Sequence, residues 1–360
     1  MKTIRLIISG GGTGGHIYPA LAIASQIKKE VEDAAILFVG AKGKMEMEKV
    51  PREGFPIKGV WISGFQRSLS LQNLLFPLKL VISLIQAYII IRRFKPNLVV
   101  GTGGFVSGPV LKISQWLSIP TLIQEQNSYP GVTNKLLSKK VHTICVAFEG
   151  MEHYFPASKI KITGNPIRSN ICENRFSERA REFFGLNPNK KTLAIIGGSL
   201  GAKRINELIA NQLDYIQSFE LQILWQCGDL YFEQYKEKVK DEVVIHPFIY
   251  QMQQFYSAAD FIISRAGAGS LSELFSAGKP LLLIPSPNVS SNHQYHNAVS
   301  LEKKGAAFVI EEKNLDADFQ AVFSKLVLDT DLQKSMHEEL KRLSKPNAAQ
   351  SIVKEISALL

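Results

Sequence analysis

The chain of 360 residues is too long for one compact core, and its length predicts two domains of about 150 residues or a little more. Hydrophobic residues make up 45% of the chain and charged residues 21%, which excludes a disordered protein. The formal net charge of +10 belongs to the first half: residues 1–164 hold 20 Lys and Arg against 9 Asp and Glu, and the remainder holds 22 against 23. This imbalance predicts an anionic partner for the first half, which could be membrane lipid, nucleic acid or a phosphorylated substrate.

Three cysteines lie scattered along the chain, at Cys145, Cys172 and Cys227. No pair of them has metal-ligand or redox spacing, so the sequence favours a reducing compartment and no disulfide framework. The N-terminal apolar run is short and enters a glycine turn at once, which indicates a strand rather than a signal peptide.

The first predicted elements form a βαβ unit. Apolar runs predict a buried strand at 4–8, a helix with its packing face at 20–27 and a second strand at 35–39. The turn between the first strand and the helix contains G-x-G-x-x-G at Gly10, Gly12 and Gly15, which raises the possibility of a dinucleotide site.

Two observations exclude the common ligands of such a turn. The second strand ends in Val39-Gly40-Ala41-Lys42, without the acidic residue that binds the ribose of NAD. His16 stands where a P-loop needs lysine, so ATP is not expected either. His16 lies at the carboxyl edge of the predicted sheet. It is either a catalytic group that titrates near neutral pH or a residue that fills the turn.

Residues 71–93 are the most apolar part of the chain. Pro77, Lys79, Ser83 and Gln86 interrupt the run, so a helix lying on a bilayer surface is favoured over one that crosses it. A buried helix, apolar on all sides, is the alternative. If the helix lies on a bilayer, the basic residues expected to contact anionic headgroups are Lys79, Arg92, Arg93, Lys95, Lys139 and Lys140.

The rest of the first half predicts buried strands at 97–100, 120–123 and 141–146. The first of these runs into a second glycine turn at Gly101–Pro109. The second is followed by the polar cluster Gln124–Asn127, which we expect to point into a cleft. The residues Ile162–Arg168 predict a hinge, in which Arg168 would bind an anion or lie in solvent.

The second half repeats the pattern, with strands predicted at 192–196, 221–225, 243–245, 261–263, 280–284 and 306–310. A glycine turn at Gly197–Ala202 precedes an amphipathic helix at 205–213. His293 and His296 begin a later helix but lack a third ligand of suitable spacing, so no metal is expected. The tail, about 345–360, predicts a helix that docks back on the first domain.

The stretch Ser264–Glu273 predicts a strand, a turn of small residues and a helix. Ser270 or Ser272 is expected to cap this helix, and a Cβ at Gly267 or Gly269 is expected to block close backbone approach. The helix start would be an anion site, with Glu273 in the first turn to accept ribose hydroxyls. An ordinary strand-to-helix turn is the alternative.

The strand, glycine turn and helix therefore recur twice in each half, at Gly10, Gly101, Gly197 and Gly267. We expect a domain at 1–164 and another at 165–344. Two Rossmann-like sheets whose turns face one cleft would suit an enzyme that joins two molecules.

Several of these segments together resemble the MurG family. They cover nearly the whole chain in the family's order: GGTGGH at Gly11–His16, GTGGFVSGP at Gly101–Pro109, EQN at Glu125–Asn127, NPIR at Asn165–Arg168, GGSxGA at Gly197–Ala202, the stretch Arg265–Glu273, and Gln294 with Asn297-Ala298.

The resemblance implies an α/β GT-B fold, with two Rossmann-like domains facing across a cleft. It implies inverting transfer of N-acetylglucosamine from UDP-GlcNAc to the muramoyl C4 hydroxyl of lipid I, forming lipid II for peptidoglycan synthesis. The implied place is the cytoplasmic side of the inner membrane. The partners would be UDP-GlcNAc, lipid I and an anionic membrane surface, without nucleic acid, cofactor or metal.

The resemblance also assigns the site. His16 would be the general base, with Glu125 as a second candidate, and Gly103 and Gly104 would belong to a loop for the acceptor diphosphate. Ile249 would bind the uracil through its backbone. Glu273 would bind the ribose, and Gln294 would bind the hydroxyls of the sugar. The full set of donor contacts would be Thr13, Gly14, Gly15, Asn127, Arg168, Ser199, Ile249, Ala268, Gly269, Ser270, Leu271, Ser272, Glu273 and Gln294.

Two positions depart from the family pattern. Leu200 replaces the usual Gln, which puts one polar contact in doubt, and Gly269 replaces a commoner Leu.

Two other functions fit parts of the sequence. One is a related GT-B enzyme such as a diacylglycerol glucosyltransferase, and the other is a nucleotide-sugar-binding or lipid-surface scaffold. The pairing of GGTGGH with EQN favours the cell-wall enzyme over the first. The presence of His16, Glu125 and Glu273 argues against the second.

Overall fold

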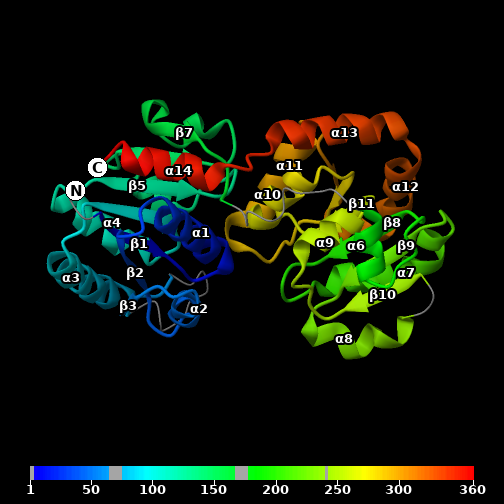
Figure 1. Cartoon of the computed structure of the whole chain (residues 1–360), viewed down its shortest axis with the longest axis horizontal. Coiled ribbons are helices and arrows are strands. Elements are labelled where there is room, and N and C mark those ends of the chain that lie inside the picture. Colours follow the sequence, from blue (N-terminus) through cyan, green and yellow to red (C-terminus); the bar gives the residue numbers. More distant parts are fainter. Residues whose placement is uncertain (1–3, 65–74, 167–176, 240–241) are drawn as a thin grey trace. The chain divides into compact units, whose positions relative to one another are not determined.

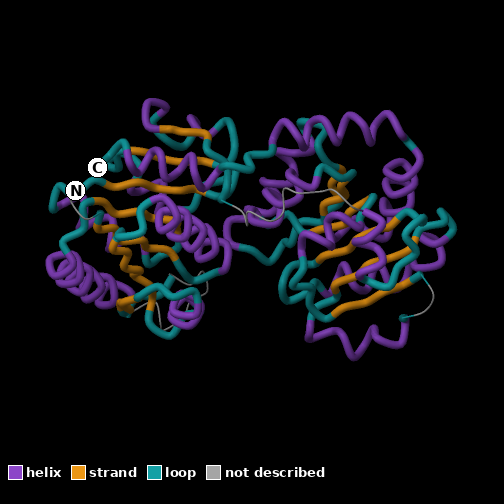
Figure 2. The backbone as a smooth tube through the Cα atoms, in the orientation of Figure 1, coloured by secondary structure: helices purple, strands orange, loops and turns teal. Residues whose placement is uncertain are grey.

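The computed structural model describes residues 4–64, 75–166, 177–239 and 242–360. The chain forms two compact units: unit 1 is residues 1–167 with 347–360, and unit 2 is residues 168–346. In each unit a sheet of parallel strands, orange in Figure 2, is flanked by helices, purple in the same view. The predicted α/β class with two Rossmann-like sheets is confirmed.

Unit 1 is built on a parallel sheet with the strand order β3-β2-β1-β4-β5-β6-β7 (Figure 1). Its strands are β1 (Arg5–Gly10), β2 (Ala35–Ala41), β3 (Ile57–Val60), β4 (Leu98–Gly103), β5 (Thr121–Glu125), β6 (Thr143–Val146) and β7 (Ile160–Ile162). Its helices are α1 (Gly14–Glu30), α2 (Glu46–Arg52), α3 (Phe76–Phe94), α4 (Ser107–Trp116), α5 (Val132–Leu137), α14 (Ala348–Ser357) and the short 3-10 turns η2 (Met151–His153) and η3 (Ala157–Lys159). Because β1 and β4 are neighbours, the glycine turns that follow them leave the same edge of the sheet side by side.

Alternate residues of a strand point to opposite faces of the sheet, and different helices cover the two faces of unit 1. Leu6 and Ile8 pack with α1 and α14, whereas Ile7 packs on the other face with α3 and α4. Helix α14 supplies Ile352 and Ile356 to this core, so the last residues of the chain complete the unit that the first residues begin.

Unit 2 has the same plan, with the strand order β10-β9-β8-β11-β12-β13. Its strands are β8 (Thr192–Ile196), β9 (Gln222–Gln226), β10 (Val243–His246), β11 (Phe261–Ser264), β12 (Leu281–Leu283) and β13 (Phe308–Val309). Its helices are α6 (Ser177–Phe183), α7 (Lys203–Gln217), α8 (Asp229–Tyr235), α9 (Met252–Ala258), α10 (Ala268–Ala277), α11 (His293–Glu302), α12 (Leu315–Leu328), α13 (Thr330–Leu343) and the 3-10 turns η5 (Lys236–Lys238), η6 (Ser290–Asn292) and η7 (Glu312–Asn314).

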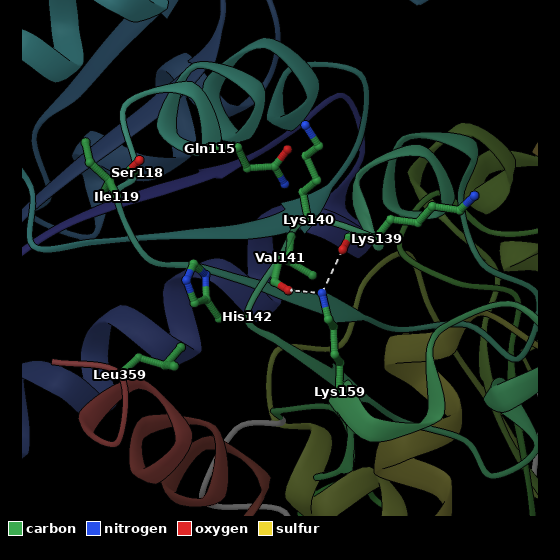
Figure 3. A pocket seen from close by; sticks show the side chains of 9 residues that line it. All are labelled: Gln115, Ser118, Ile119, Lys139, Lys140, Val141, His142, Lys159 and Leu359. Carbon is green, nitrogen blue, oxygen red and sulfur yellow. Dashed lines mark hydrogen bonds between the residues drawn. The ribbon is translucent and has the colours of Figure 1, made fainter.

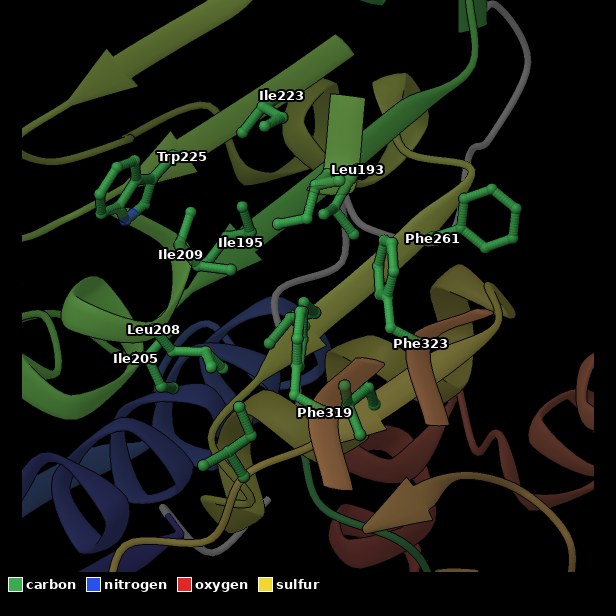
Figure 4. Close-up of a cluster of buried hydrophobic side chains, with 14 of the residues drawn as sticks. Leu193, Ile195, Ile205, Leu208, Ile209, Ile223, Trp225, Phe261, Phe319 and Phe323 are labelled. Atoms are coloured by element: carbon green, nitrogen blue, oxygen red, sulfur yellow. The ribbon is translucent and has the colours of Figure 1, made fainter. Parts of the chain in front are cut away.

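Aromatic side chains fill the core of unit 2 between the sheet and α12 (Figure 4). Phe319 and Phe323 stack with ring centroids 5.2 Å apart. The fully buried Trp225 donates its indole N–H to Oδ1 of Asn206 over 3.0 Å, so the polar atom of this ring is satisfied inside the core.

Helix α3 holds most of the apolar run predicted at 71–93, while residues 71–74 lie outside the described residues. It buries Ser83, Ala87 and Ile91 against the rest of unit 1 and leaves its opposite face in solvent. None of the helices in the described parts of the chain is both long and apolar enough to cross a membrane.

One segment of the first half differs from the prediction. Strand β5 continues through Gln124 and Glu125, because these two residues pair with Cys145 and Val146 of β6. Their side chains are buried, as is that of Gln126, so the cleft expected at this cluster stays a prediction for these three residues.

Candidate functional site

Each of the four glycine turns ends at a helix: α1, α4, α7 and α10. In these described helices no N-cap side chain accepts a hydrogen bond from the first turn, and no acidic residue lies there. The positive ends of the four helix dipoles are therefore not neutralised by their own first turns. They lie at the carboxyl edges of the two sheets, where open α/β proteins bind ligands and where helix starts bind anions.

The fully buried Glu46, at the start of α2, stabilises the first glycine turn. Its carboxylate accepts hydrogen bonds from the backbone N–H groups of Gly12, at 3.1 Å, and Ala41, at 3.0 Å. The role of Glu46 was not predicted, because nothing in the sequence around it distinguishes it from a solvated acidic residue in a helix.

His16 and Thr102 join the first and second glycine turns by a reciprocal pair of hydrogen bonds. His16 Nδ1 lies 3.0 Å from the carbonyl oxygen of Thr102, and Thr102 Oγ1 donates to the carbonyl oxygen of His16 over 2.8 Å. Gln126 adds a third contact, with Oε1 3.0 Å from Nδ1. The half-buried imidazole is therefore fixed through Nδ1, and no described residue forms a hydrogen bond with its Nε2.

Gly103 and Gly104 are required by the close packing of these two turns. A Cβ on Gly103 would lie 2.8 Å from His16 Nδ1, and one on Gly104 would lie 2.2 Å from the carbonyl oxygen of Gly11. Both glycines also have positive φ, at 102° and 79°. Their place beside His16 is set by the packing of the chain itself.

The Glu125 carboxylate is buried and accepts hydrogen bonds from four donors, three in the loop that follows β5 and one in α5. Oε1 accepts from N and Nδ2 of Asn127, at 3.0 and 3.3 Å, and Oε2 accepts from Gly131 N at 3.1 Å and Asn134 Nδ2 at 2.8 Å. Both carboxylate oxygens therefore already accept hydrogen bonds. The arrangement favours Glu125 as the residue that orders the loop carrying Asn127, rather than as a base.

The remaining predicted residues of unit 1 lie on the same edge of its sheet. Thr13 is the N-cap residue of α1, and Gly14 and Gly15 begin the helix. Arg168, the first residue of unit 2, lies outside the described residues, so its predicted contact with the donor stays a prediction.

In unit 2, two predictions for the turn between β11 and α10 are wrong. The helix begins at Ala268, so Ser270 and Ser272 lie inside it and neither caps it. Ser272 Oγ instead donates to the carbonyl oxygen of Ala268 over 3.0 Å. Glu273 lies in the second turn, not the first, and its Oε2 accepts from the Tyr256 hydroxyl over 2.9 Å.

Contacts within the protein do not explain the glycines of this turn, so the close approach expected there stays a prediction. A Cβ on Gly269 would meet nothing within 4 Å, and one on Gly267 would come no closer than 3.9 Å to Ser270 Oγ. Neither glycine is therefore required by the protein's own backbone, and Gly269 lies in the first turn of α10. Neither position carries a side chain that would hinder close approach by a ligand.

An amide side chain missed by the sequence analysis connects two of the predicted donor segments of unit 2. Gln226, at the end of β9, donates from Nε2 to the carbonyl oxygen of Gly198 over 2.9 Å and accepts at Oε1 from Ile249 N–H over 3.2 Å. The Ile249 N–H group therefore already has a partner in this structure. The neighbouring Ser199 and Leu200 are exposed.

Arg265 and Gln294 stabilise the segments around the end of β12. Arg265 pairs with Glu312 and donates from Nη1 to the carbonyl oxygen of Ile284 over 3.0 Å. Gln294 Oε1 accepts from the backbone N–H of Ser286 over 2.9 Å. A cavity of about 380 Å³ adjoins this segment and is lined in part by Pro285, Asn292 and Glu312.

Two titratable groups near the same edge are shifted by burial. Desolvation raises the pKa of the Cys227 thiol to about 11, so this cysteine stays protonated at neutral pH. Desolvation also lowers the pKa of His246, which favours the neutral imidazole. Among the described residues, no group of three His, Cys, Asp or Glu side chains is placed to hold a metal ion.

The larger cavity, of about 640 Å³, lies in unit 1 beside the first residues of β5 and β6 (Figure 3). It is therefore at the amino edge of the sheet, opposite the glycine turns. Lys159 reaches into it, and its ammonium group donates to the carbonyl oxygens of Lys139 and Val141 over 2.7 and 2.8 Å. These bonds give Lys159 a structural role, and the cavity is separate from the glycine turns.

Comparison with known proteins identifies the chain. The model of the glycosyltransferase family 28 N-terminal domain matches residues 6–146, and that of the C-terminal domain matches residues 192–355. The UDP-N-acetylglucosamine--N-acetylmuramyl-(pentapeptide) pyrophosphoryl-undecaprenol N-acetylglucosamine transferase of Flavobacterium psychrophilum is 51% identical over 362 residues, covering 100% of this chain and 99% of the relative. The chain belongs to the MurG family of glycosyltransferases.

Other relatives agree with this assignment. The transferase of the same description from Cytophaga hutchinsonii is 47% identical over 360 residues, covering 100% of this chain and 98% of the relative. The crystal structure of MurG from Acinetobacter baumannii matches with a TM-score of 0.80 and 28% identity, covering 99% of both chains. The calicheamicin glycosyltransferase CalG4, at 15% identity, a TM-score of 0.73 and coverage of 100% and 99%, shares the fold alone. The predicted GT-B fold and the resemblance to the MurG family are confirmed.

We predict that Gly103→Ala impairs sugar transfer more than its effect on stability explains. Gly43→Ala is the matched control, because Gly43 also has positive φ, at 70°, but a Cβ there would meet nothing within 4 Å. Both variants should lose about 1–3 kcal/mol of stability from backbone strain, as measured by thermal denaturation. Only Gly103→Ala displaces His16, so it alone should lower the transfer rate, by about tenfold or more. Equal rates in the two variants would contradict this reading of the turn.

Proposed function

We propose that this enzyme transfers N-acetylglucosamine from UDP-GlcNAc to the muramoyl C4 hydroxyl of lipid I, with inversion at the sugar carbon, and so forms lipid II for peptidoglycan synthesis. The observation that carries the proposal is the full-length similarity to transferases whose descriptions name this donor and this acceptor. The positions of His16 and of the uncapped helix starts are consistent with it.

His16 is the proposed general base. The hydrogen bond between Nδ1 and the Thr102 carbonyl leaves Nε2 as the nitrogen that accepts the proton of the acceptor hydroxyl. The hydroxyl oxygen then forms a bond to C1 of N-acetylglucosamine as the bond from C1 to the diphosphate oxygen breaks. The electron pair of that bond leaves with UDP.

The donor is proposed to bind mainly to unit 2. The start of α10 would place backbone N–H groups and the positive end of a helix dipole at the diphosphate, which stabilises the charge that develops on the leaving UDP. Glu273, whose orientation is supported by the hydrogen bond from Tyr256, would accept the ribose hydroxyls. Uracil pairing with the backbone of Ile249 would require Gln226 Oε1 to give up the Ile249 N–H.

The reaction is tested by measuring UDP release from UDP-GlcNAc with a lipid I analogue, with diacylglycerol and with no acceptor. We expect release at a substantial rate with the lipid I analogue alone. Release with diacylglycerol and not with lipid I would assign the enzyme to the alternative class of lipid glucosyltransferases. Slow release that no acceptor accelerates would contradict both transferase functions.

The role of His16 is tested by His16→Ala. Because a general base contributes about 10²–10⁴-fold to a rate, kcat should fall by this factor while the Kd for UDP-GlcNAc stays within about twofold. Isothermal titration with UDP-GlcNAc and the UDP-release assay measure the two quantities. A turnover rate near that of the wild type would transfer the base role to another group.

We further propose that unit 1 lies on the cytoplasmic side of the inner membrane as a peripheral protein. The exposed face of α3 carries Leu78, Val81 and Ile85, each more than half exposed. Trp116 on the neighbouring α4 is 60% exposed, with the Lys112 ammonium 5.4 Å from its ring centroid. An apolar face next to basic residues is typical of interfacial helices, and the excess positive charge of the first half suits anionic lipid.

Membrane binding is tested by Ile85→Glu, with Leu230→Glu as the matched control. Leu230 is an exposed leucine on α8 of unit 2, outside the proposed membrane face. Burial of one such side chain contributes about 1.5–3 kcal/mol, so Ile85→Glu should weaken binding to anionic vesicles by about tenfold or more. Flotation at low salt measures it. Equal binding by the two variants, or no binding by the wild type, would contradict the proposal.

A further inference from the structure

The hydrogen bonds of His16 determine which ring nitrogen carries the proton. A backbone carbonyl oxygen only accepts hydrogen bonds, and the Thr102 carbonyl lies 3.0 Å from His16 Nδ1. This contact favours the neutral tautomer with its hydrogen on Nδ1 and its lone pair on Nε2.

The orientation of the Gln126 amide is fixed in the same way. Its Nε2 lies 2.7 Å from the carbonyl oxygen of Thr102 and 3.1 Å from that of Gln124, and both oxygens are acceptors. A flipped amide would place its oxygen against two carbonyls. Gln126 Oε1 consequently faces His16, 3.0 Å from Nδ1, as a second acceptor for the same N–H.

Two more buried amides extend this arrangement. Gln126 Nε2 also donates to Oε1 of Gln124, whose Nε2 donates to Oδ1 of Asn165 over 2.8 Å. Asn165 Nδ2 in turn donates to the backbone carbonyl of Gln126 over 3.0 Å. The three side chains are at most 4% exposed. Each amide thus fixes the orientation of the next, so Gln126 cannot turn without breaking several buried hydrogen bonds.

We propose that Gln126 is a positioning residue that holds the proton of the neutral His16 ring on Nδ1, and so leaves Nε2 to accept the proton of the acceptor hydroxyl. The part of this inference that concerns catalysis rests on the proposed base role of His16. A neutral amide suits the task because it accepts the Nδ1–H bond without a negative charge. A carboxylate at this position would stabilise the imidazolium, which is not a base.

The carboxylates that hold the surrounding turns are already bonded to other groups. Glu46, from α2, accepts the N–H groups of Gly12 and Ala41, and Glu125, from β5, accepts four donors from its own loop and α5. In the described structure neither forms a hydrogen bond with the His16 ring. Both stay in place in the variants below, so a change in the titration of His16 reports on Gln126.

The direct test is the ¹⁵N NMR spectrum of the His16 ring in the full chain, which distinguishes a protonated from an unprotonated ring nitrogen. At pH 8 the wild type should show the Nδ1–H form. Gln126→Glu should move the appearance of the imidazolium to higher pH by about one unit or more. Gln115→Glu is the matched control, because it adds the same charge to unit 1 at the far edge of the sheet and should leave the titration unchanged.

The pH profile of turnover gives the second readout. The acid limb of Gln126→Glu should move with the NMR titration, so that the rate falls about tenfold near neutral pH and recovers at alkaline pH. Gln126→Met, which keeps the volume and adds no charge, should lower kcat about three- to tenfold without moving the limb, and should produce a detectable Nε2–H form.

The outcomes separate this inference from the function on which it rests. A wild-type ring in the Nε2–H form, or spectra of both Gln126 variants that equal the wild type, would overturn the positioning role. In Gln126→Glu the NMR titration of His16 could shift while the acid limb of the pH–rate profile does not. That result would support control of the tautomer by Gln126 and contradict the role of His16 as the base. If Gln126→Glu does not fold, the positioning role of Gln126 is still tested by the wild-type ¹⁵N spectrum and by the ¹⁵N spectrum and kcat of Gln126→Met.

Discussion

The site in unit 1 depends on the pair of hydrogen bonds between His16 and Thr102. Each residue donates to the carbonyl oxygen of the other, so the first and second glycine turns are locked together and the imidazole has one orientation. The pair forms because β1 and β4 are adjacent parallel strands whose register shifts at Ser9 and Gly10, where the chain leaves the sheet. The lack of side chains on Gly10 and Gly103 leaves room for Thr102 and for the ring.

Both units place a glycine turn between a parallel strand and a helix, but the groups around these turns differ between the units. In unit 1 buried polar groups converge on the glycine turns: Glu46 holds the first turn, and Gln126 faces the histidine. In unit 2 a Cβ on Gly269, in the first turn of α10, would meet nothing within 4 Å, and the amide of Gln226 connects two separate loops. This difference agrees with the proposed division of labour, in which unit 1 orients a proton acceptor and unit 2 binds an anionic leaving group.

The fold was largely predictable because buried parallel strands are continuous apolar runs and the glycine turns mark where they end. The short strands β3 and β7 were not predicted, since each is partly exposed and lacks a continuous apolar run. In the site, His16 and the glycine turns could be predicted, because they form recognisable motifs after apolar runs. Glu46, Thr102 and Gln226 could not, because their partners are backbone groups brought near by the fold rather than by spacing. The helix start at α10 was misjudged for a related reason: serine is a common cap, yet here the small residues themselves begin the helix.

The place of α14 in unit 1 has a consequence for how the protein forms during synthesis. The core between β1 and α1 needs Ile352, Val353 and Ile356, which are synthesised after every residue of unit 2. Unit 2 is a continuous stretch of chain and has all its residues earlier. The second half of the sequence can therefore reach its native packing while the first half still waits for its final helix, which reverses the usual N-to-C order of domain folding on the ribosome.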